Sequence, residues 1–217
     1  MEEIENYDIN NINNKQIKKF VQDEIDHCTQ HKIKVQLKNS ETVAFNGAEC
    51  GGYFMDEPNL LLAVAIGKDP ETWLPVFVHE TCHKDQYVEK DPVWDLKIKE
   101  YFNAGDIFDM WLNHAVELTK SQLKEVLKQV MLVEIDCEKR SLEKIKRYNL
   151  PINHIEYIQK SNAYIFYYHA IARKREWGSK DAPYENPKIW QEMPVDFNQD
   201  YSKINRNMLN LFFKHCW

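Results

Sequence analysis

The chain has 217 residues, of which 43% are hydrophobic and 12% aromatic, so it can build the core of an ordinary domain and is not a disordered chain. Its 28 basic and 34 acidic residues give a net charge of -6, which argues against broad binding to nucleic acid or anionic membranes. The longest apolar run, Leu60 to Ile66, is far shorter than the about 20 residues of a membrane-spanning helix. We therefore expect neither a nucleic-acid partner nor a membrane partner.

The N-terminal residues and the cysteines bear on the cellular compartment. The acidic start, Met1 to Asp8, lacks the basic and apolar segments of a secretory signal. The 5 cysteines are odd in number and form no CxxC pair, so we expect thiols and not a disulfide framework. Together these features predict a cytoplasmic protein.

The first third of the chain is predicted to form one helix and a small mixed sheet. Apolar residues with helical spacing predict a helix over 16–30. Alternation of apolar and polar residues predicts a strand from Ile33 to Leu37. Further extended segments are expected at Val43 to Phe45, Tyr53 to Met55 and Leu60 to Ile66, with a turn at Asn46-Gly47.

Beyond Gly67 the chain is predicted to be almost entirely helical. One helix is expected to begin between Thr72 and Pro75 and to end near Lys90, and an aromatic segment over 93–112 is interrupted at 103–105. Later helices are expected over 120–148, from Asn153 to about Trp177, and over 204–213, with a loop at 178–200. We expect one α+β domain, with an N-terminal α/β lobe at about 15–90 and a helical lobe at about 91–217.

The clearest chemical signal is the sequence His79-Glu80-Thr81-Cys82-His83, which matches the HExxH pattern. Two histidines four residues apart lie on one face of a helix, so both imidazoles can bind one metal ion. Glu80 lies beside the first histidine and can act as general base toward the attacking water. A coincidental match, with histidines that are merely hydrogen-bonded, is the alternative.

A third metal ligand is expected on the long helix over 120–148. Glu134 falls in the middle of an apolar stripe on that helix, and Glu138 lies one turn further along the same face. An unpaired carboxylate is unfavourable in apolar surroundings, so Glu134 is expected to be paired or bound to metal. Glu134 is the best candidate for the third ligand, and an ion pair with an arginine or lysine is the alternative. The other members of the stripe are Leu123, Leu127, Val130, Cys137, Ser141 and Ile145.

This combination resembles the zincin metallopeptidases, in which an edge strand precedes the HExxH helix and pairs with the substrate backbone. The resemblance implies that 60–66 is the edge strand, that His79 and His83 bind Zn2+ and that Glu80 is the catalytic base. It further implies a protein or peptide substrate.

Two branches of the zincins differ in their third ligand. The metzincin branch would place a histidine and a glycine where this chain has Glu89 and Gln86, which speaks against that branch, although Glu89 itself offers a carboxylate. The gluzincin branch takes a glutamate from a later helix, which implies Glu134 here. Glu138 then resembles the carboxylate that orients a ligand histidine through its free ring N–H.

Several assignments stay open. Peptide deformylases combine HExxH with an upstream cysteine ligand, and Cys50 would be its counterpart, although the residues around it match that family poorly. Cys82 and Cys137 are expected to be small core residues. The donor that stabilises the oxyanion is not assigned; Tyr157, Tyr164, Tyr167, Tyr168 and His169 are the aromatic candidates.

A second resemblance rests on three segments in the later part of the chain: Glu134 to Arg140, Lys146 to Pro151 and Pro183 to Pro187. They are similar to uncharacterised HExxH proteins of tailed bacteriophages, which implies a phage origin and a location in the host cytoplasm or the virion. We expect a zinc-dependent metallopeptidase. The alternative is a non-catalytic binding or virion structural protein on a zincin scaffold.

Overall fold

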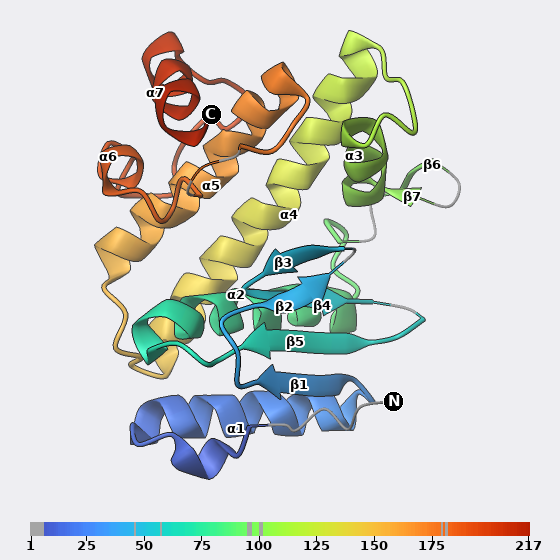
Figure 1. Ribbon diagram of the computed structural model, residues 1–217. Coiled ribbons are helices and arrows are strands. Elements are labelled where there is room, and N and C mark those ends of the chain that lie inside the picture. Colours follow the sequence, from blue (N-terminus) through green and yellow to red (C-terminus); the bar gives the residue numbers. More distant parts are fainter. Residues whose placement is uncertain are drawn as a thin grey trace. The chain divides into compact units, whose positions relative to one another are not determined.

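The computed structural model describes residues 7–45, 47–56, 58–94, 97–99, 102–178, 180 and 182–217 (Figure 1). It has an α+β fold, with a small mixed sheet near the N-terminus and a mainly helical C-terminal region, as predicted. The described residues divide into two compact units. The first comprises Met1–Asp91 and Arg140–Ile152, and the second comprises Pro92–Lys139 and Asn153–Trp217. That the two units form one domain stays a prediction.

The first unit contains the predicted N-terminal helix and strands. Its elements are η1 (Ile9–Asn11), α1 (Lys15–Gln30), β1 (Lys34–Lys38), β2 (Val43–Phe45), β3 (Ala48–Cys50), β4 (Gly52–Met55), β5 (Leu61–Ala65) and α2 (Pro70–Val88). The long helix α4 (Lys120–Arg147) begins in the second unit and ends in the first. The helix over 16–30 and the four extended segments expected from the sequence are confirmed.

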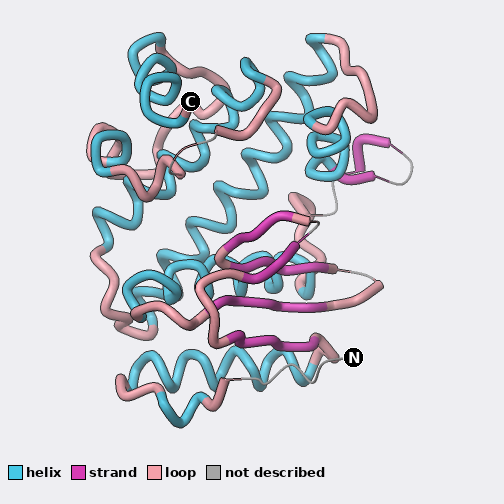
Figure 2. Tube along the Cα trace, viewed as in Figure 1, coloured by secondary structure: helices cyan, strands magenta, loops and turns pink. Residues whose placement is uncertain are grey.

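The main sheet has three strands in the order β1-β5-β4 (Figure 2). β1 pairs with β5 in parallel, and β4 pairs with β5 in the antiparallel direction. The expectation that 60–66 is an edge strand is therefore wrong, because β5 is the central strand and β4 lies at an edge. The continuous apolar run of β5 suits a strand that is buried, and Leu62 through Val64 are fully buried.

Helix α2 carries the HExxH motif and packs on β4 and β5. It begins at Pro70, immediately after Asp69 at the N-cap position, and not between Thr72 and Pro75 as expected. Pro70 occupies a first-turn position, where a missing N–H costs little. Pro75 lies inside the helix, so its missing N–H leaves the carbonyl of Glu71 without its usual helical partner.

A glycine allows α2 to approach β4 closely. A Cβ atom added to Gly52 would lie 2.9 Å from Val76 Cγ1 and 3.0 Å from the carbonyl oxygen of Ala63. The neighbouring Gly51 has more space, because the nearest atom to its added Cβ, Val76 Cγ2, is 3.4 Å away. Val76 lies one turn before Glu80, so this contact sets the distance between the strand and the motif.

We expect Gly52→Ala to lower the free energy of unfolding by about 1–3 kcal/mol, because the added methyl group overpacks the contact with Val76. Gly51→Ala is the matched control, and we expect a change of less than about 1 kcal/mol. Urea unfolding followed by circular dichroism measures both. Equal effects of the two substitutions would contradict the close contact at Gly52.

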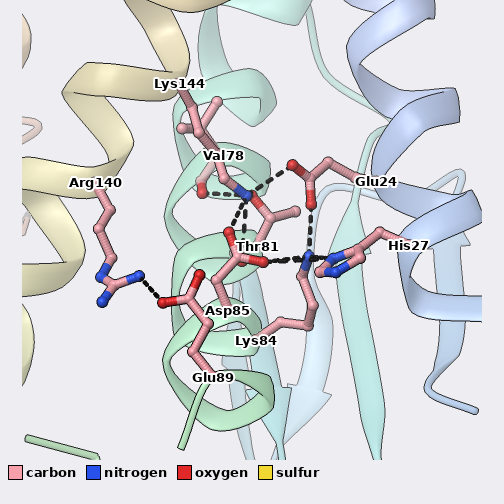
Figure 3. A network of polar contacts seen from close by, with 9 residues as sticks. All are labelled: Glu24, His27, Val78, Thr81, Lys84, Asp85, Glu89, Arg140 and Lys144. Atoms are coloured by element: carbon pink, nitrogen blue, oxygen red, sulfur yellow. Dashed lines mark hydrogen bonds and ion pairs between the residues drawn. The ribbon is translucent and has the colours of Figure 1, made fainter. Parts of the chain in front are cut away.

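Three buried side chains, Glu24, Lys84 and Lys144, and the partly buried Asp85 form a ring of ion pairs in the first unit (Figure 3). Lys84 Nζ lies 2.8 Å from Glu24 Oε2 and 2.5 Å from Asp85 Oδ1. Lys144 Nζ lies 2.7 Å from Glu24 Oε1 and 2.7 Å from Asp85 Oδ2. Each ammonium group contacts both carboxylates, so the two positive charges are balanced by two negative charges.

The ring joins three helices around the motif. Glu24 comes from α1, Lys84 and Asp85 come from α2, and Lys144 comes from the last turns of α4. Lys144 Nζ also donates to the hydroxyl of Thr81 at 3.1 Å. Because these α2 residues lie within and directly after the motif, the ring holds α1 and the end of α4 against the segment that bears the histidines.

The second unit is mainly helical. It contains β6 (Lys97–Lys99), β7 (Phe102–Asn103), α3 (Ala104–Leu112), the first part of α4, α5 (His154–Lys174), α6 (Pro187–Trp190) and α7 (Arg206–Cys216). The expected break at 103–105 is the start of α3, where Asn103 and Asp106 form a capping box. Asn153 caps α5 as predicted, but α5 ends at Lys174, earlier than expected, where Arg175 adopts a left-handed conformation.

Two further expectations concern the chain as a whole. All the cysteines are thiols, as their number and spacing predicted. Within the described residues, each helix is either too short or too polar to cross a membrane.

Candidate functional site

The two motif histidines converge on one point beside α2. His79 and His83 lie one turn apart, and their Nε2 atoms are 3.0 Å from each other. The imidazole planes are perpendicular, with ring centroids 4.6 Å apart. Two nitrogen ligands of one tetrahedral zinc, each about 2.0–2.1 Å from the ion, lie about 3.3 Å apart. The separation of the Nε2 atoms therefore fits two ligands of a single zinc ion.

Glu80 is buried on α2, directly after the first histidine. Burial raises the pKa of the Cys50 thiol, and the nearby carboxylate of Glu80 raises it further. This interaction places Cys50 close to Glu80 within the first unit.

Cys50 does not join the two histidines as a metal ligand. Its Sγ donates to the backbone carbonyl of Val43 at 3.6 Å. Among the described side chains, it forms no group with His79 and His83 in which all ligand atoms lie within 4.8 Å of one another. The arrangement typical of a deformylase therefore has no geometric support.

Glu89, at the position of the third metzincin ligand, is engaged elsewhere. Arg140 Nη1 lies 2.6 Å from Glu89 Oε2 (Figure 3). Arg140 Nη2 lies 2.6 Å from Asp91 Oδ2. Glu89 is at the C-terminal cap of α2, and its side chain is more than half exposed. The guanidinium of Arg140 therefore ties the end of α2 to α4 and leaves the metzincin assignment without support.

Gln86 is a neighbour of the motif that sequence analysis did not assign to the site. It is fully buried, and its Oε1 lies 2.9 Å from His83 Nδ1. The signal was present in the sequence, because a polar residue three positions after a histidine on a helix lies next to it. It was interpreted only as the absence of a metzincin glycine.

Glu134, the expected third ligand, lies in the second unit, on the part of α4 that precedes Arg140. It is buried, as the apolar stripe predicted. Tyr168 Oη donates to Glu134 Oε1 at 3.3 Å, and the hydroxyl groups of Tyr164 and Tyr168 are 3.0 Å apart. Its place in one site with His79 and His83 stays a prediction.

The environment of Glu134 keeps these two tyrosines protonated. Burial raises the pKa of Tyr168 and of Tyr164 well above the ordinary value, and the carboxylate of Glu134 raises both further. A protonated phenol is a hydrogen-bond donor, in agreement with the hydrogen bond that Tyr168 donates to Glu134. Within this unit Tyr168 is a hydrogen-bond partner of Glu134, and a lysine or arginine partner stays the alternative.

Glu138 is held by two hydroxyl groups from α5. Its Oε2 accepts hydrogen bonds from Tyr157 Oη at 2.5 Å and from Ser161 Oγ at 2.7 Å. These contacts fix the carboxylate on its face of α4, one turn beyond Glu134. That Glu138 orients a ligand histidine stays a prediction.

The remaining aromatic candidates for an oxyanion donor make structural contacts. The hydroxyl of Tyr167 accepts the backbone N–H of Gly178 at 2.8 Å, and His169 Nε2 lies 2.8 Å from the carbonyl oxygen of Tyr201. Both contacts tie α5 to the segments that follow it. The tyrosines nearest to a proposed ligand are therefore Tyr164 and Tyr168, a distinction that the sequence did not make.

A further group of possible metal ligands in the first unit contains a lysine ammonium group. Glu24, His27 and Asp85 bring their ligand atoms within 4.8 Å of one another. Lys84 Nζ, besides its two carboxylate partners, lies 2.5 Å from His27 Nδ1 (Figure 3). Burial and the charge of Lys84 lower the pKa of His27, which keeps its ring neutral. The ammonium group occupies the cation position, so this cluster is a structural ion pair network.

In comparisons with protein-family models, curated proteins and solved structures, no match to this chain was found. The functional assignment therefore depends on the geometry and chemistry of the chain's own residues.

Proposed function

We propose that this protein is a zinc-dependent metallopeptidase of zincin type. His79, His83 and Glu134 are the proposed zinc ligands, and Glu80 is the proposed general base. The observation that carries the proposal is the convergence of the two motif Nε2 atoms, 3.0 Å apart, beside a buried glutamate on the same helix. Two imidazoles and one carboxylate form a ligand set typical of catalytic zinc.

The helix α4 supports the choice of Glu134. Its last turns bind α2 within the first unit, through Lys144 and Arg140, and Glu134 precedes Arg140 by less than two turns of the same helix. The carboxylate of Glu134 is buried and accepts the Tyr168 hydroxyl. A hydrogen bond to an outer-shell donor is usual for a carboxylate ligand.

The sheet supports the zincin assignment if β4, and not the 60–66 segment, is the strand that pairs with substrate. In zincins the strand that pairs with substrate lies at the sheet edge next to the active-site helix. Here β4 is at an edge, is antiparallel to β5 and packs on α2. Among the described strands none pairs with its second edge. We therefore assign substrate backbone pairing to β4 instead of the 60–66 segment.

The chemistry requires a Lewis acid and a base. Zinc, when bound, would polarise the substrate carbonyl and lower the pKa of the attacking water. The carboxylate of Glu80 accepts the proton from that water and delivers it to the nitrogen of the departing amine. Peptide hydrolysis then needs no covalent bond between substrate and protein.

The zinc content of the purified protein tests the ligand set. We expect near one zinc per chain in the parent protein and much less in His83→Ala and Glu134→Ala, because each loses one of three ligands. Glu143→Ala, an exposed residue on the same helix, is the matched control and should keep its zinc. Elemental analysis of chelator-free preparations measures all four.

Two outcomes would change the proposal. Cys137 is a fully buried thiol three residues after Glu134 on α4, and thiolate is a common zinc ligand. Full zinc in Glu134→Ala, with loss of zinc in Cys137→Ser, would therefore assign the third ligand to Cys137. An absence of zinc in the parent, even after incubation with zinc, would overturn the peptidase proposal. It would favour the alternative, a binding or virion structural protein on this scaffold.

A further inference from the structure

We propose that Gln86 is a positioning residue for the metal site: its side-chain carbonyl holds His83 in the tautomer that presents Nε2 as a ligand. This inference rests on the proposed zinc site. It concerns one turn of one helix, because His83 and Gln86 are three residues apart on α2. It adds a residue that the HExxH pattern does not contain.

The contact is close and buried. Gln86 Oε1 lies 2.9 Å from His83 Nδ1, a normal hydrogen-bond distance. Gln86 is fully buried, and the exposed fraction of His83 is 9%. A buried polar pair is costly to break, because each lost partner leaves a desolvated group. The orientation of the His83 ring is therefore strongly constrained.

The chemistry of the two groups determines where the proton lies. A neutral imidazole has one N–H donor and one nitrogen lone pair. An amide oxygen can only accept a hydrogen bond, so His83 Nδ1 carries the proton and donates it. The lone pair then lies on His83 Nε2, which is the atom that faces His79 Nε2. A metal ion needs that lone pair.

The opposite tautomer would block the site. A proton on His83 Nε2 would point at His79 Nε2, only 3.0 Å away, and would occupy the position of the proposed ion. An acceptor at Nδ1 favours the proton on that nitrogen, so His83 Nε2 accepts the 3.0 Å hydrogen bond from His79 Nε2–H, and only His79 has to move its Nε2 proton when an ion binds. Outer-shell acceptors of this kind typically change metal affinity by about 10–100-fold when they are removed.

Two substitutions separate the accepting role from packing. Gln86→Met keeps a chain of similar length and volume but removes the acceptor. Gln86→Glu keeps only acceptor atoms when ionised, whereas glutamine also carries an amide that can donate. We expect Gln86→Met to weaken zinc binding by about 10–100-fold, and Gln86→Glu to bind at least as tightly as the parent.

The experiment measures the zinc dissociation constant by competition with a chromophoric chelator for the parent and both variants. Thermal unfolding in excess chelator checks that the zinc-free variants are folded. The tautomer of His83 is measured directly by 15N NMR of the ring nitrogens in zinc-free protein. We expect a proton on Nδ1 in the parent and a mixture of tautomers in folded Gln86→Met.

The outcomes distinguish this inference from the proposed function. Equal zinc affinity and an unchanged His83 tautomer in Gln86→Met would overturn the role of Gln86 and leave the zinc site standing. Weak binding in both variants, without rescue by Gln86→Glu, would show a packing effect and would also overturn it. If the parent binds no zinc, the proposed function fails, and the NMR comparison alone decides whether Gln86 sets the tautomer.

Discussion

Glu80→Gln is expected to slow peptide hydrolysis by about 10²–10⁴-fold while zinc content stays near one per chain. Glutamine matches glutamate in size and fills the same buried position beside His79. It cannot accept the proton of the attacking water, and it is not a proposed ligand. The substitution therefore removes the base and leaves the metal site in place.

The measurement begins with a search for a cleavable peptide. A mixture of peptides of varied sequence is incubated with zinc-loaded parent protein, and the cleaved bonds are identified by mass spectrometry. The best substrate is then used to compare kcat/KM of the parent and Glu80→Gln. Glu71→Gln, an exposed residue in the first turn of α2, is the matched control and should retain full activity. A Glu80→Gln protein that cleaves as fast as the parent would show that the mechanism is wrong.

Glu24→Gln is expected to lower the free energy of unfolding by about 3–5 kcal/mol. Glu24 contacts both Lys84 and Lys144, at 2.8 and 2.7 Å, and its side chain is 6% exposed. Its removal leaves two buried ammonium groups with Asp85 as their remaining carboxylate in the ring. An unbalanced buried charge lowers the free energy of unfolding far more than the loss of a surface ion pair does.

The adjacent residue offers a matched control. Asp23 pairs with Lys19 at 2.7 Å, but the exposed fractions of the Lys19 and Asp23 side chains are 69% and 37%. Asp23→Asn should therefore change the free energy of unfolding by less than about 1 kcal/mol. Urea unfolding of the parent and both variants at one ionic strength makes the comparison. Similar losses in the two variants would contradict a dominant role for burial.

The ring also predicts how stability changes in acid. Burial by itself would raise the pKa of Asp85, but the ammonium groups of Lys144 and Lys84 outweigh it and hold the pKa below the ordinary value of 3.8. A lowered pKa in the folded state contributes stability that is complete above 3.8 and is lost as the pH falls through the folded-state pKa. The free energy of unfolding of the parent should therefore decrease below about pH 4.

Local patterns in the sequence predicted local structure well. Alternation from Ile33 to Leu37 predicted β1, and the spacing of Ile17, Phe20 and Val21 predicted α1. Glu134 was identified because it interrupts an apolar stripe on α4. A similar stripe is present on α1, where Glu24 lies among buried apolar residues. That signal marked Glu24 as a buried, partnered carboxylate, although sequence analysis did not use it.

Local sequence patterns did not predict which residues are the partners of these buried carboxylates. Glu24 is 60 residues from Lys84 and 120 residues from Lys144, so no helical or strand period connects them. The order of strands in the sheet also depends on contacts between residues far apart in the sequence. β5 reads as an apolar strand, but its central position depends on pairing with both β1 and β4.

The sequence by itself determined the α+β class, the positions of most helices and strands, and the pairing of His79 with His83 on one helical face. These features depend on contacts within a few residues, which the periods of helix and strand encode directly. Only the tertiary structure decided that β4 is the edge strand, that Lys84 lies in the cluster of Glu24, His27 and Asp85, and that Tyr168 contacts Glu134. Each of these depends on which distant segments pack together, and that choice is made by the burial of the whole core.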